Sequence, residues 1–257
     1  MSAKKELTHF GVKVIKKSNG QSIVAKGAYN NRANLRSLNT GSKHYHKSKG
    51  ELLHSVMLAP EEAPGWLLEL SNNYEEFFSY IEGGETRKDA QYMREVTIGL
   101  PHELSGRQNI ELATAFVQTA FVDQGMVANL VIHKPTDKGD QRNIHAHILL
   151  TMREIQPDGF GKKVRAWNRL VPQWRENWEA VANGYLVEKG FEARVKMKSY
   201  KKRGIDKEAS KYKGPQYTPK KTKEWHLDAI DIASTLEKAS ARTTVNAGGR
   251  VFSERSR

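Results

Sequence analysis

Short segments in which hydrophobic and polar side chains alternate recur along the chain and predict β-strands. In residues 9–16, Phe10, Val12 and Val14 lie at alternate positions, which is the pattern of a strand with one buried face. Comparable segments predict four more strands, at residues 51–58, 94–100, 127–133 and 143–151. The last two are separated only by residues 134–142, whose Pro, Asp and Gly are turn formers, so these two strands can pair as a hairpin.

Hydrophobic residues at helical spacing predict helices between the strands. Ser22 is the expected N-cap of a helix that runs to about Leu35. Ser105 and Gln108 form a capping box at the start of another helix, which Gly125 is expected to end. Two more helices are predicted, one from Pro64 through aromatic residues to Phe78 and one over residues 170–189. This alternation, without a glycine-rich nucleotide loop, predicts an α/β or α+β fold.

The balance of basic and acidic residues indicates what kind of partner the protein binds. The 257 residues include 42 Lys and Arg against 29 Asp and Glu, which gives a formal charge of +13 and a pI near 9.7. Such an excess favours polyanions, with nucleic acid ahead of anionic membranes. A merely basic soluble protein is the alternative, because net charge indicates partners and not the fold.

Most of the excess charge lies in residues 196–223, which contain eleven Lys or Arg and two acidic residues, a net charge of +9. Three tyrosines are interleaved with these cations. Cations that follow phosphates and rings that stack on bases suit a single strand, so we expect this segment to grip DNA. A solvated or disordered loop is an equally weighted alternative. The candidate contacts are Lys198, Lys201, Lys202, Arg203, Lys211 and Lys213.

Features that the chain lacks exclude several classes of protein. It has no cysteine, which excludes a disulfide scaffold, a thiolate zinc site and cysteine catalysis. No apolar stretch approaches the ~20 residues that span a bilayer, and residues 1–17 lack the apolar core of a signal peptide. We therefore expect a cytoplasmic protein without membrane insertion.

Three histidines are candidates for a metal site. His145 and His147 are separated by Ala146 in a predicted strand, so their side chains point to the same face, ~6.5–7 Å apart along the strand. His133 ends the preceding strand and lies beside them if the two strands pair. A lone histidine is more often satisfied by hydrogen bonds, but three that converge favour a metal with open coordination positions. Imidazoles suit Zn, Ni, Co or Mn, whereas phosphoryl chemistry often uses Mg or Mn.

Tyr29 is the candidate nucleophile. It lies in a predicted helix of small residues that would let another backbone or a DNA strand approach, with Ala25 one turn before it and Arg32 one turn after. Arg32 is added to the candidate DNA contacts. Taken alone, Tyr29 is more often a packed aromatic residue, and only the wider pattern favours the catalytic interpretation.

That pattern resembles the relaxase domain of the MobA/MobL family of plasmid mobilisation proteins, also called the MobQ type. The resemblance covers roughly residues 9–217. Its motifs are the Ala-Tyr pair at Tyr29 followed by Arg32, the segment Arg94–Leu104, then His133 and the segment Gly139–His147. The blocks around Glu95 and the two neighbouring histidines are the most specific parts.

The resemblance implies a fold and domain boundaries. The fold is a central antiparallel sheet flanked by helices, of the HUH endonuclease type, in a relaxase domain over residues 1–223. Residues 224–257 are expected to form a helix and tail or the start of a further region. The family's Asp-His-Arg-Ser run reads Lys-Met-Lys-Ser at residues 196–199, although Gly-Ile-Asp follows at 204–206, so this segment departs from the family's pattern.

The resemblance also implies a reaction. Tyr29 would attack one phosphodiester of single-stranded or hairpin DNA at a plasmid transfer origin, form a 5′-phosphotyrosine link and later rejoin the strand. His133, His145 and His147 would hold a divalent ion, expected to be Mn or Mg. Accessory DNA-processing and secretion-coupling proteins are the implied further partners.

Glu95 has two possible roles and one unrelated interpretation. Val96 and Ile98 face away from it in the predicted strand, so Glu95 can project toward the histidines. There it would accept the phenol proton or orient a ligand histidine. The unrelated interpretation is a surface carboxylate.

Three other functions compete with the relaxase. A rolling-circle replication initiator shares the chemistry, but here Tyr29 precedes the histidines, which favours a relaxase. A non-catalytic single-strand DNA-binding protein of the same fold is a second alternative. An RNA-binding or basic scaffolding protein would leave the histidine cluster unused.

Overall fold

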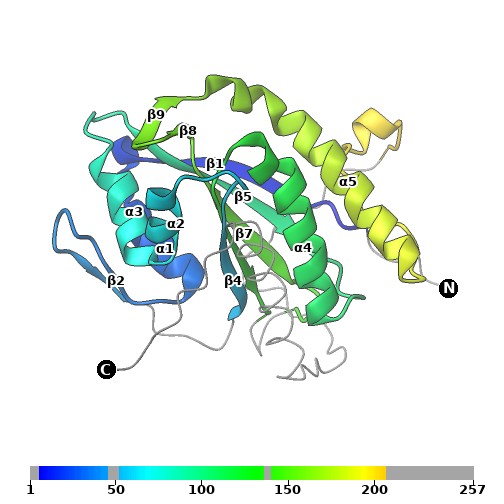
Figure 1. Cartoon of the computed structure of the whole chain (residues 1–257). Coiled ribbons are helices and arrows are strands. Elements are labelled where there is room, and N and C mark those ends of the chain that lie inside the picture. The colour runs from blue at the N-terminus through cyan, green and yellow to red at the C-terminus, as the bar shows by residue number, and fades with distance from the viewer. Residues whose placement is uncertain (1–5, 46–51, 136–139, 207–257) are drawn as a thin grey trace.

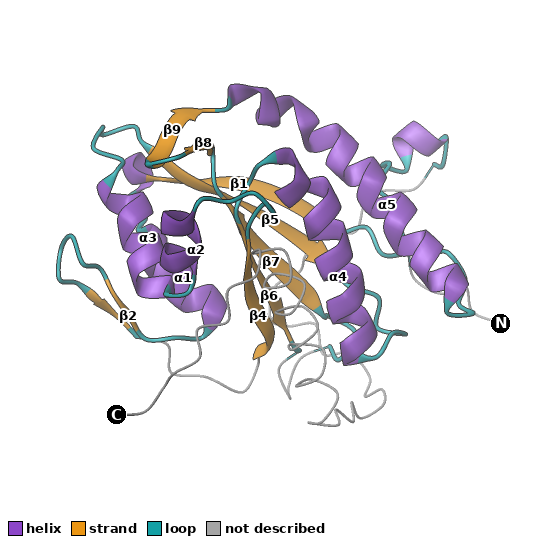
Figure 2. Ribbon diagram, in the orientation of Figure 1, coloured by secondary structure: helices purple, strands orange, loops and turns teal. Residues whose placement is uncertain are grey.

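A five-stranded antiparallel sheet lies at the centre of the molecule, with strand order β1-β5-β7-β6-β4 (Figures 1 and 2). The computed structural model describes residues 6–45, 52–135 and 140–206. The strands of the sheet are β1 (Phe10–Lys16), β4 (Leu52–Leu58), β5 (Gln91–Gly99), β6 (Ala128–His133) and β7 (His145–Leu150). All five predicted strands belong to this sheet, and the predicted central antiparallel sheet is confirmed.

Helices cover both faces of the sheet, and the alternation of side chains divides the core between them (Figure 2). One face carries α4 (Gly106–Ala120) and α5 (Val171–Glu188), and the other carries α1 (Ile23–Asn31), α2 (Gly65–Ser71) and α3 (Tyr74–Gly83). In β7, Ala146 and Ile148 belong to the α4–α5 core and Leu149 to the other. His145 and His147 therefore lie on the α1 face, since alternate residues share a face.

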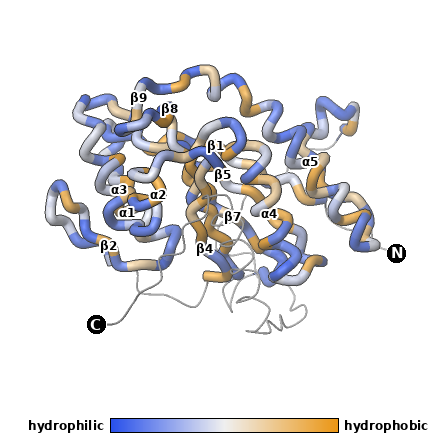
Figure 3. Tube along the Cα trace, viewed as in Figure 1, coloured by the Kyte–Doolittle hydropathy of each residue, from blue (hydrophilic) through white to orange (hydrophobic). Residues whose placement is uncertain are grey.

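Smaller elements connect these layers. Two short hairpins pair β2 (Leu35–Arg36) with β3 (Lys43–His44) and β8 (Arg153–Gln156) with β9 (Gly159–Lys163). The 3-10 helices are η1 (Lys17–Asn19), η2 (Val122–Gln124), η3 (Arg165–Leu170) and η4 (Lys201–Arg203). Hydrophobic positions gather along the central strands and the helix faces that meet them (Figure 3).

Three helices differ from their predicted extents. The helix expected to end at Gly125 ends at Ala120, and Gly125 instead caps the 3-10 helix η2 that follows. The first predicted helix ends at Asn31 and not near Leu35, because Arg32 adopts a left-handed conformation. The helix predicted from Pro64 is two helices, because the Asn73 side chain accepts hydrogen bonds from the N–H groups of two glutamates and starts a new helix. The capping box of Ser105 is confirmed.

Some predictions concern residues that the structure does not describe. Lys211, Lys213 and the helix expected within residues 224–257 lie outside the described residues. Within the described ranges, no helix combines the length and the apolar composition that crossing a membrane requires.

His54 in β4 is a buried histidine away from the predicted metal site. Its side chain is 4% exposed, and its Nε2 atom has no hydrogen-bond partner. Burial lowers the pKa of His54 to about 4, because the interior disfavours the charged imidazolium. The unfolded chain therefore takes up a proton near pH 6.5 that the folded protein does not accept until about pH 4.

We predict that the free energy of unfolding decreases between pH 6.5 and pH 4, and that His54→Leu reduces this decrease by about 3 kcal/mol. Urea denaturation at a series of pH values measures both proteins. Parallel curves for the two proteins would contradict the assignment.

Candidate metal centre and nucleophile

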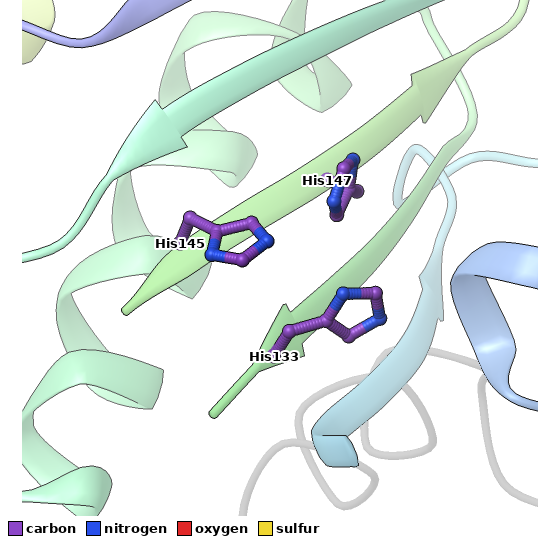
Figure 4. A group of neighbouring side chains, drawn as sticks. All are labelled: His133, His145 and His147. Atoms are coloured by element: carbon purple, nitrogen blue, oxygen red, sulfur yellow. The ribbon is translucent and has the colours of Figure 1, made fainter. Parts of the chain in front are cut away.

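The three predicted histidines come together at one end of the sheet (Figure 4). His133 ends β6 and lies directly opposite His145, the first residue of β7, while His147 lies opposite Val131. The ring centroids are 4.9 to 5.5 Å apart. One ligand atom from each ring lies within 4.8 Å of the others. The predicted hairpin pairing and the common face of the histidines are therefore confirmed.

Main-chain carbonyls select the tautomers of two of the rings. Nε2 of His133 donates to the carbonyl of Asn30 over 2.7 Å, and Nδ1 of His145 donates to the carbonyl of Asn143 over 3.1 Å. Burial lowers the pKa of His133 to about 3 and lowers that of His145, so both rings are neutral at neutral pH. Nδ1 of His133 and Nε2 of His145 consequently retain a lone pair for a metal.

Glu95 selects the tautomer of the third ring. Its Oε1 atom accepts a hydrogen bond from Nδ1 of His147 over 2.8 Å, which leaves Nε2 of His147 as the third donor of a lone pair. Metal sites often contain a carboxylate that accepts a hydrogen bond from a ligand histidine and so orients its ring. Three imidazoles with convergent lone pairs fit a divalent ion and leave coordination positions for phosphate oxygens.

The Glu95 side chain has no solvent exposure, and cations surround it. Lys13 of β1 lies 2.9 Å from Oε2, and Lys26 of α1 lies 2.8 Å from Oε1. Burial raises a carboxyl pKa, but the hydrogen bond from His147 and the charge of Lys26 outweigh it, so the pKa of Glu95 lies well below its ordinary value. Glu95 is thus anionic at neutral pH, which favours an orienting role over proton uptake.

Tyr29 lies in the last turn of α1 and is 49% exposed. Two cations lie over its ring, with Nζ of Lys26 5.1 Å and the guanidinium carbon of Arg32 4.8 Å from the centroid. Lys26 also binds Glu95, and Nη2 of Arg32 lies 3.4 Å from Nδ1 of His133. The tyrosine ring is therefore connected to the histidine cluster through both cations.

The small residues of α1 contact another helix. A Cβ atom at Gly27 would lie 2.3 Å from the ring of Phe78 in α3, so glycine permits the close approach of these two helices. Ala28 is also buried in the core under α1. Of the two alternatives predicted for these small residues, the approach of another part of the protein therefore applies at Gly27, which faces Phe78.

A buried polar network attaches the end of α1 to the sheet. The Asn31 side chain donates to Asn129 of β6 over 2.9 Å and accepts from Ser55 of β4 over 2.5 Å. Ser55 in turn lies 2.7 Å from the hydroxyl of Tyr74. Because a buried amide is costly to leave unpaired, this network holds Asn31, and with it the neighbouring turn, in one position.

The predicted DNA-gripping segment is described only up to residue 206. Lys201 and Lys202 are exposed in η4. Arg203 forms a bidentate pair with Glu6, at 2.7 and 2.9 Å, so this arginine attaches η4 to the residues before β1. Lys198 is exposed in the preceding segment.

Four residues of the site were missed from the sequence: Lys13, Lys26, Asn30 and Asn31. The one available signal was the spacing of Lys26, which lies one helical turn before Tyr29. The others contact residues far away in the chain, and no local pattern marks them.

Sequence comparisons give the chain's relatives. The sequence profile of the MobA/MobL family matches residues 21–223. The probable conjugal transfer protein TraA of Sinorhizobium fredii is 30% identical, over 77% of this chain and 20% of the relative. The mobilization protein MobL of Acidithiobacillus ferridurans is 29% identical, over 80% of this chain and 61% of the relative. The chain spans about a fifth of the length of the TraA relatives.

Solved structures share the fold. One, described as "Molecular Basis of Vancomycin Resistance Transfer in Staphylococcus aureus", has a TM-score of 0.67 and 32% identity, and covers 76% of this chain and 100% of its own. The metal-bound structure of the conjugative relaxase TrwC in complex with oriT DNA has a TM-score of 0.51 and 13% identity. The match covers 91% of this chain and 98% of the TrwC chain. The central sheet with flanking helices is therefore a relaxase fold.

We predict that Glu95→Gln weakens Mn²⁺ binding by about 10- to 100-fold, because the neutral amide orients His147 less strongly. Titration calorimetry with Mn²⁺ alone measures the affinity. Glu85→Gln is a matched control, since Glu85 is 7% exposed and pairs with Arg153 and Lys163 at 2.8 and 3.0 Å. Equal affinities for Glu95→Gln and the wild type would contradict the orienting role.

Proposed function

The chain belongs to the MobA/MobL family, and from this premise we propose that it nicks and rejoins one DNA strand at a plasmid transfer origin. Tyr29 is the nucleophile, and His133, His145 and His147 bind a divalent ion, which we expect to be Mn²⁺ or Mg²⁺. The DNA is single-stranded or forms a hairpin beside the nick. Accessory DNA-processing and secretion-coupling proteins are further partners in this proposal.

One observation carries the proposal. Three histidine lone pairs converge beside the end of a helix whose exposed tyrosine is in contact with two cations. A binding protein without catalysis has no need for this combination. The negative phosphate of a DNA strand, by contrast, is attracted to such a cluster of cations.

The reaction exchanges one phosphodiester for another. The phenol oxygen of Tyr29 forms a bond to phosphorus as it loses its proton, and the bond from phosphorus to the 3′ oxygen breaks. That oxygen takes up one proton, which balances the one that the phenol releases, and leaves as a 3′ hydroxyl, while the 5′ phosphate stays on the tyrosine. Rejoining reverses these steps and needs no nucleotide cofactor, since a phosphodiester is conserved throughout.

Other residues orient the histidine rings and place positive charge near the reacting atoms. The divalent ion, when bound, supplies positive charge that offsets the charge developing on the phosphate. Glu95 holds the ring of His147, and Asn30 holds that of His133. Lys26 keeps its ammonium group over the Tyr29 ring while it is paired with Glu95, so the attacking oxygen develops its negative charge near a cation.

We predict that Tyr29→Phe abolishes a metal-dependent covalent adduct with labelled single-stranded transfer-origin DNA, because the attacking oxygen is removed. The adduct is measured on a denaturing gel, with Mn²⁺ or Mg²⁺ and with or without EDTA. Tyr80→Phe is the control, since Tyr80 has a similar exposure of 45% and should leave the adduct unchanged.

The same gel separates the alternatives. Tight binding without cleavage of a verified cognate site by the wild type would indicate a non-catalytic DNA-binding protein. An adduct that persists in Tyr29→Phe would place the nucleophile elsewhere.

For η4 we predict that replacing both Lys201 and Lys202 by Gln weakens DNA binding and lowers the slope of log affinity against log salt by about 1.4, since each phosphate contact to a single strand contributes about 0.7. Fluorescence anisotropy with a single-stranded oligonucleotide over a salt series measures the slope. Lys88→Gln, at an exposed position before β5, is the control. An unchanged slope in the double variant would exclude η4 from the DNA interface.

A further inference from the structure

Arg32 has an unusual backbone conformation. It caps the C-terminus of α1 with φ 51 and ψ 34, and its N–H group donates to the carbonyls of Ala28 and Tyr29. Among the described residues it is the one non-glycine residue with a positive φ. Helices that end in this conformation usually have glycine there, because a Cβ atom is sterically disfavoured. Residues with such strained backbone often lie at functional sites, where the side chain is needed.

The Arg32 side chain contacts the proposed nucleophile and a proposed metal ligand together. It is 7% exposed. Nη1 donates to the carbonyl of Tyr29 over 2.9 Å, and the guanidinium carbon lies 4.8 Å from the tyrosine ring centroid. Nη2 lies 3.4 Å from Nδ1 of His133. Glycine would suit the backbone but would remove all of these side-chain contacts.

Arg32 therefore approaches the atom that a metal would need. Because Nε2 of His133 is engaged by the Asn30 carbonyl, the lone pair of this ring is on Nδ1. The lone pair cannot accept a hydrogen bond from Nη2 and bind a metal ion at the same time. A guanidinium also repels a divalent cation.

We propose that the guanidinium of Arg32 exchanges partners when a metal binds. Without metal, Nη2 occupies the lone pair of His133. When a divalent ion takes that lone pair, Nη2 turns to a non-bridging oxygen of the phosphodiester beside Tyr29, while Nη1 keeps its bond to the Tyr29 carbonyl. The phosphate part of this inference rests on the proposed function, and the exchange at His133 does not. Planar guanidinium groups bind phosphate oxygens in this manner.

If Arg32 exchanges partners in this way, its replacement by glycine should change metal binding and nicking in opposite directions. Arg32→Gly should strengthen Mn²⁺ binding several-fold, because a competing donor and a repelling charge are removed. It should slow single-turnover nicking by about 100-fold, as the loss of one donor to a transition-state oxygen does. The loss of DNA affinity should be smaller, since only one phosphate contact is removed. A residue that merely supported the fold would weaken metal binding and nicking together.

The experiment uses the full chain and measures three quantities. Titration calorimetry with Mn²⁺ alone, without DNA, gives the metal affinity, and gel assays give the single-turnover rate and the DNA affinity. Arg32→Lys keeps the charge with fewer donors and should restore part of the rate. Arg87→Gly, whose side chain pairs with Asp89 in an exposed loop, is the matched control.

The outcomes separate this inference from the proposed function. Equal or weaker Mn²⁺ binding by Arg32→Gly would overturn the exchange, even if Tyr29→Phe abolishes the adduct. Stronger Mn²⁺ binding with an unchanged nicking rate would overturn the phosphate contact. If the wild type nicks no DNA, the proposed function fails, and the Mn²⁺ titrations still decide whether Arg32 competes at His133.

Discussion

The charge of Glu95 is fully buried, and the arrangement of the site follows from the need to compensate it. A buried carboxylate is tolerated only with partners that supply charge or hydrogen bonds. Those partners are Lys13 of β1, Lys26 of α1 and His147 of β7. The edge strand β1, the helix α1 and the central strand β7 thus all contact the carboxylate of Glu95. Because Lys26 shares a helix with Tyr29, the compensation of this charge also determines where the tyrosine lies.

Compensation alone does not make a buried carboxylate functional. Glu85 is likewise buried and paired with two cations, Arg153 and Lys163. All of its ion-pair partners in the described part of the chain are permanently charged side chains, and they attach the β8–β9 hairpin to the loop after α3. Glu95 differs in that one of its partners is a histidine whose second nitrogen faces two other imidazoles. The functional signal is therefore the identity of the partner and not the burial or the charge.

Much of the sheet could be predicted from the sequence, because alternation within a strand is a local property. The same alternation placed His145 and His147 on one face, and the short connection brought His133 beside them. The end of α1 could not be predicted, since Arg32 adopts a glycine-like conformation that its own side chain does not favour. The roles of Asn30 and Lys13 depend on contacts with residues 103 and 82 positions away, which no local pattern encodes.

The last turn of α1 couples two properties that are separate in principle. Its carbonyl at Asn30 fixes which nitrogen of His133 faces the other rings, and its side chain at Tyr29 is the candidate nucleophile. The Asn31 side chain, between the turn and the sheet, holds both at once through its bonds to Asn129 and Ser55. A shift of this turn would change the donor atom of His133 and the position of the phenol together. The donor atom of His133 and the position of Tyr29 therefore cannot vary independently in this protein.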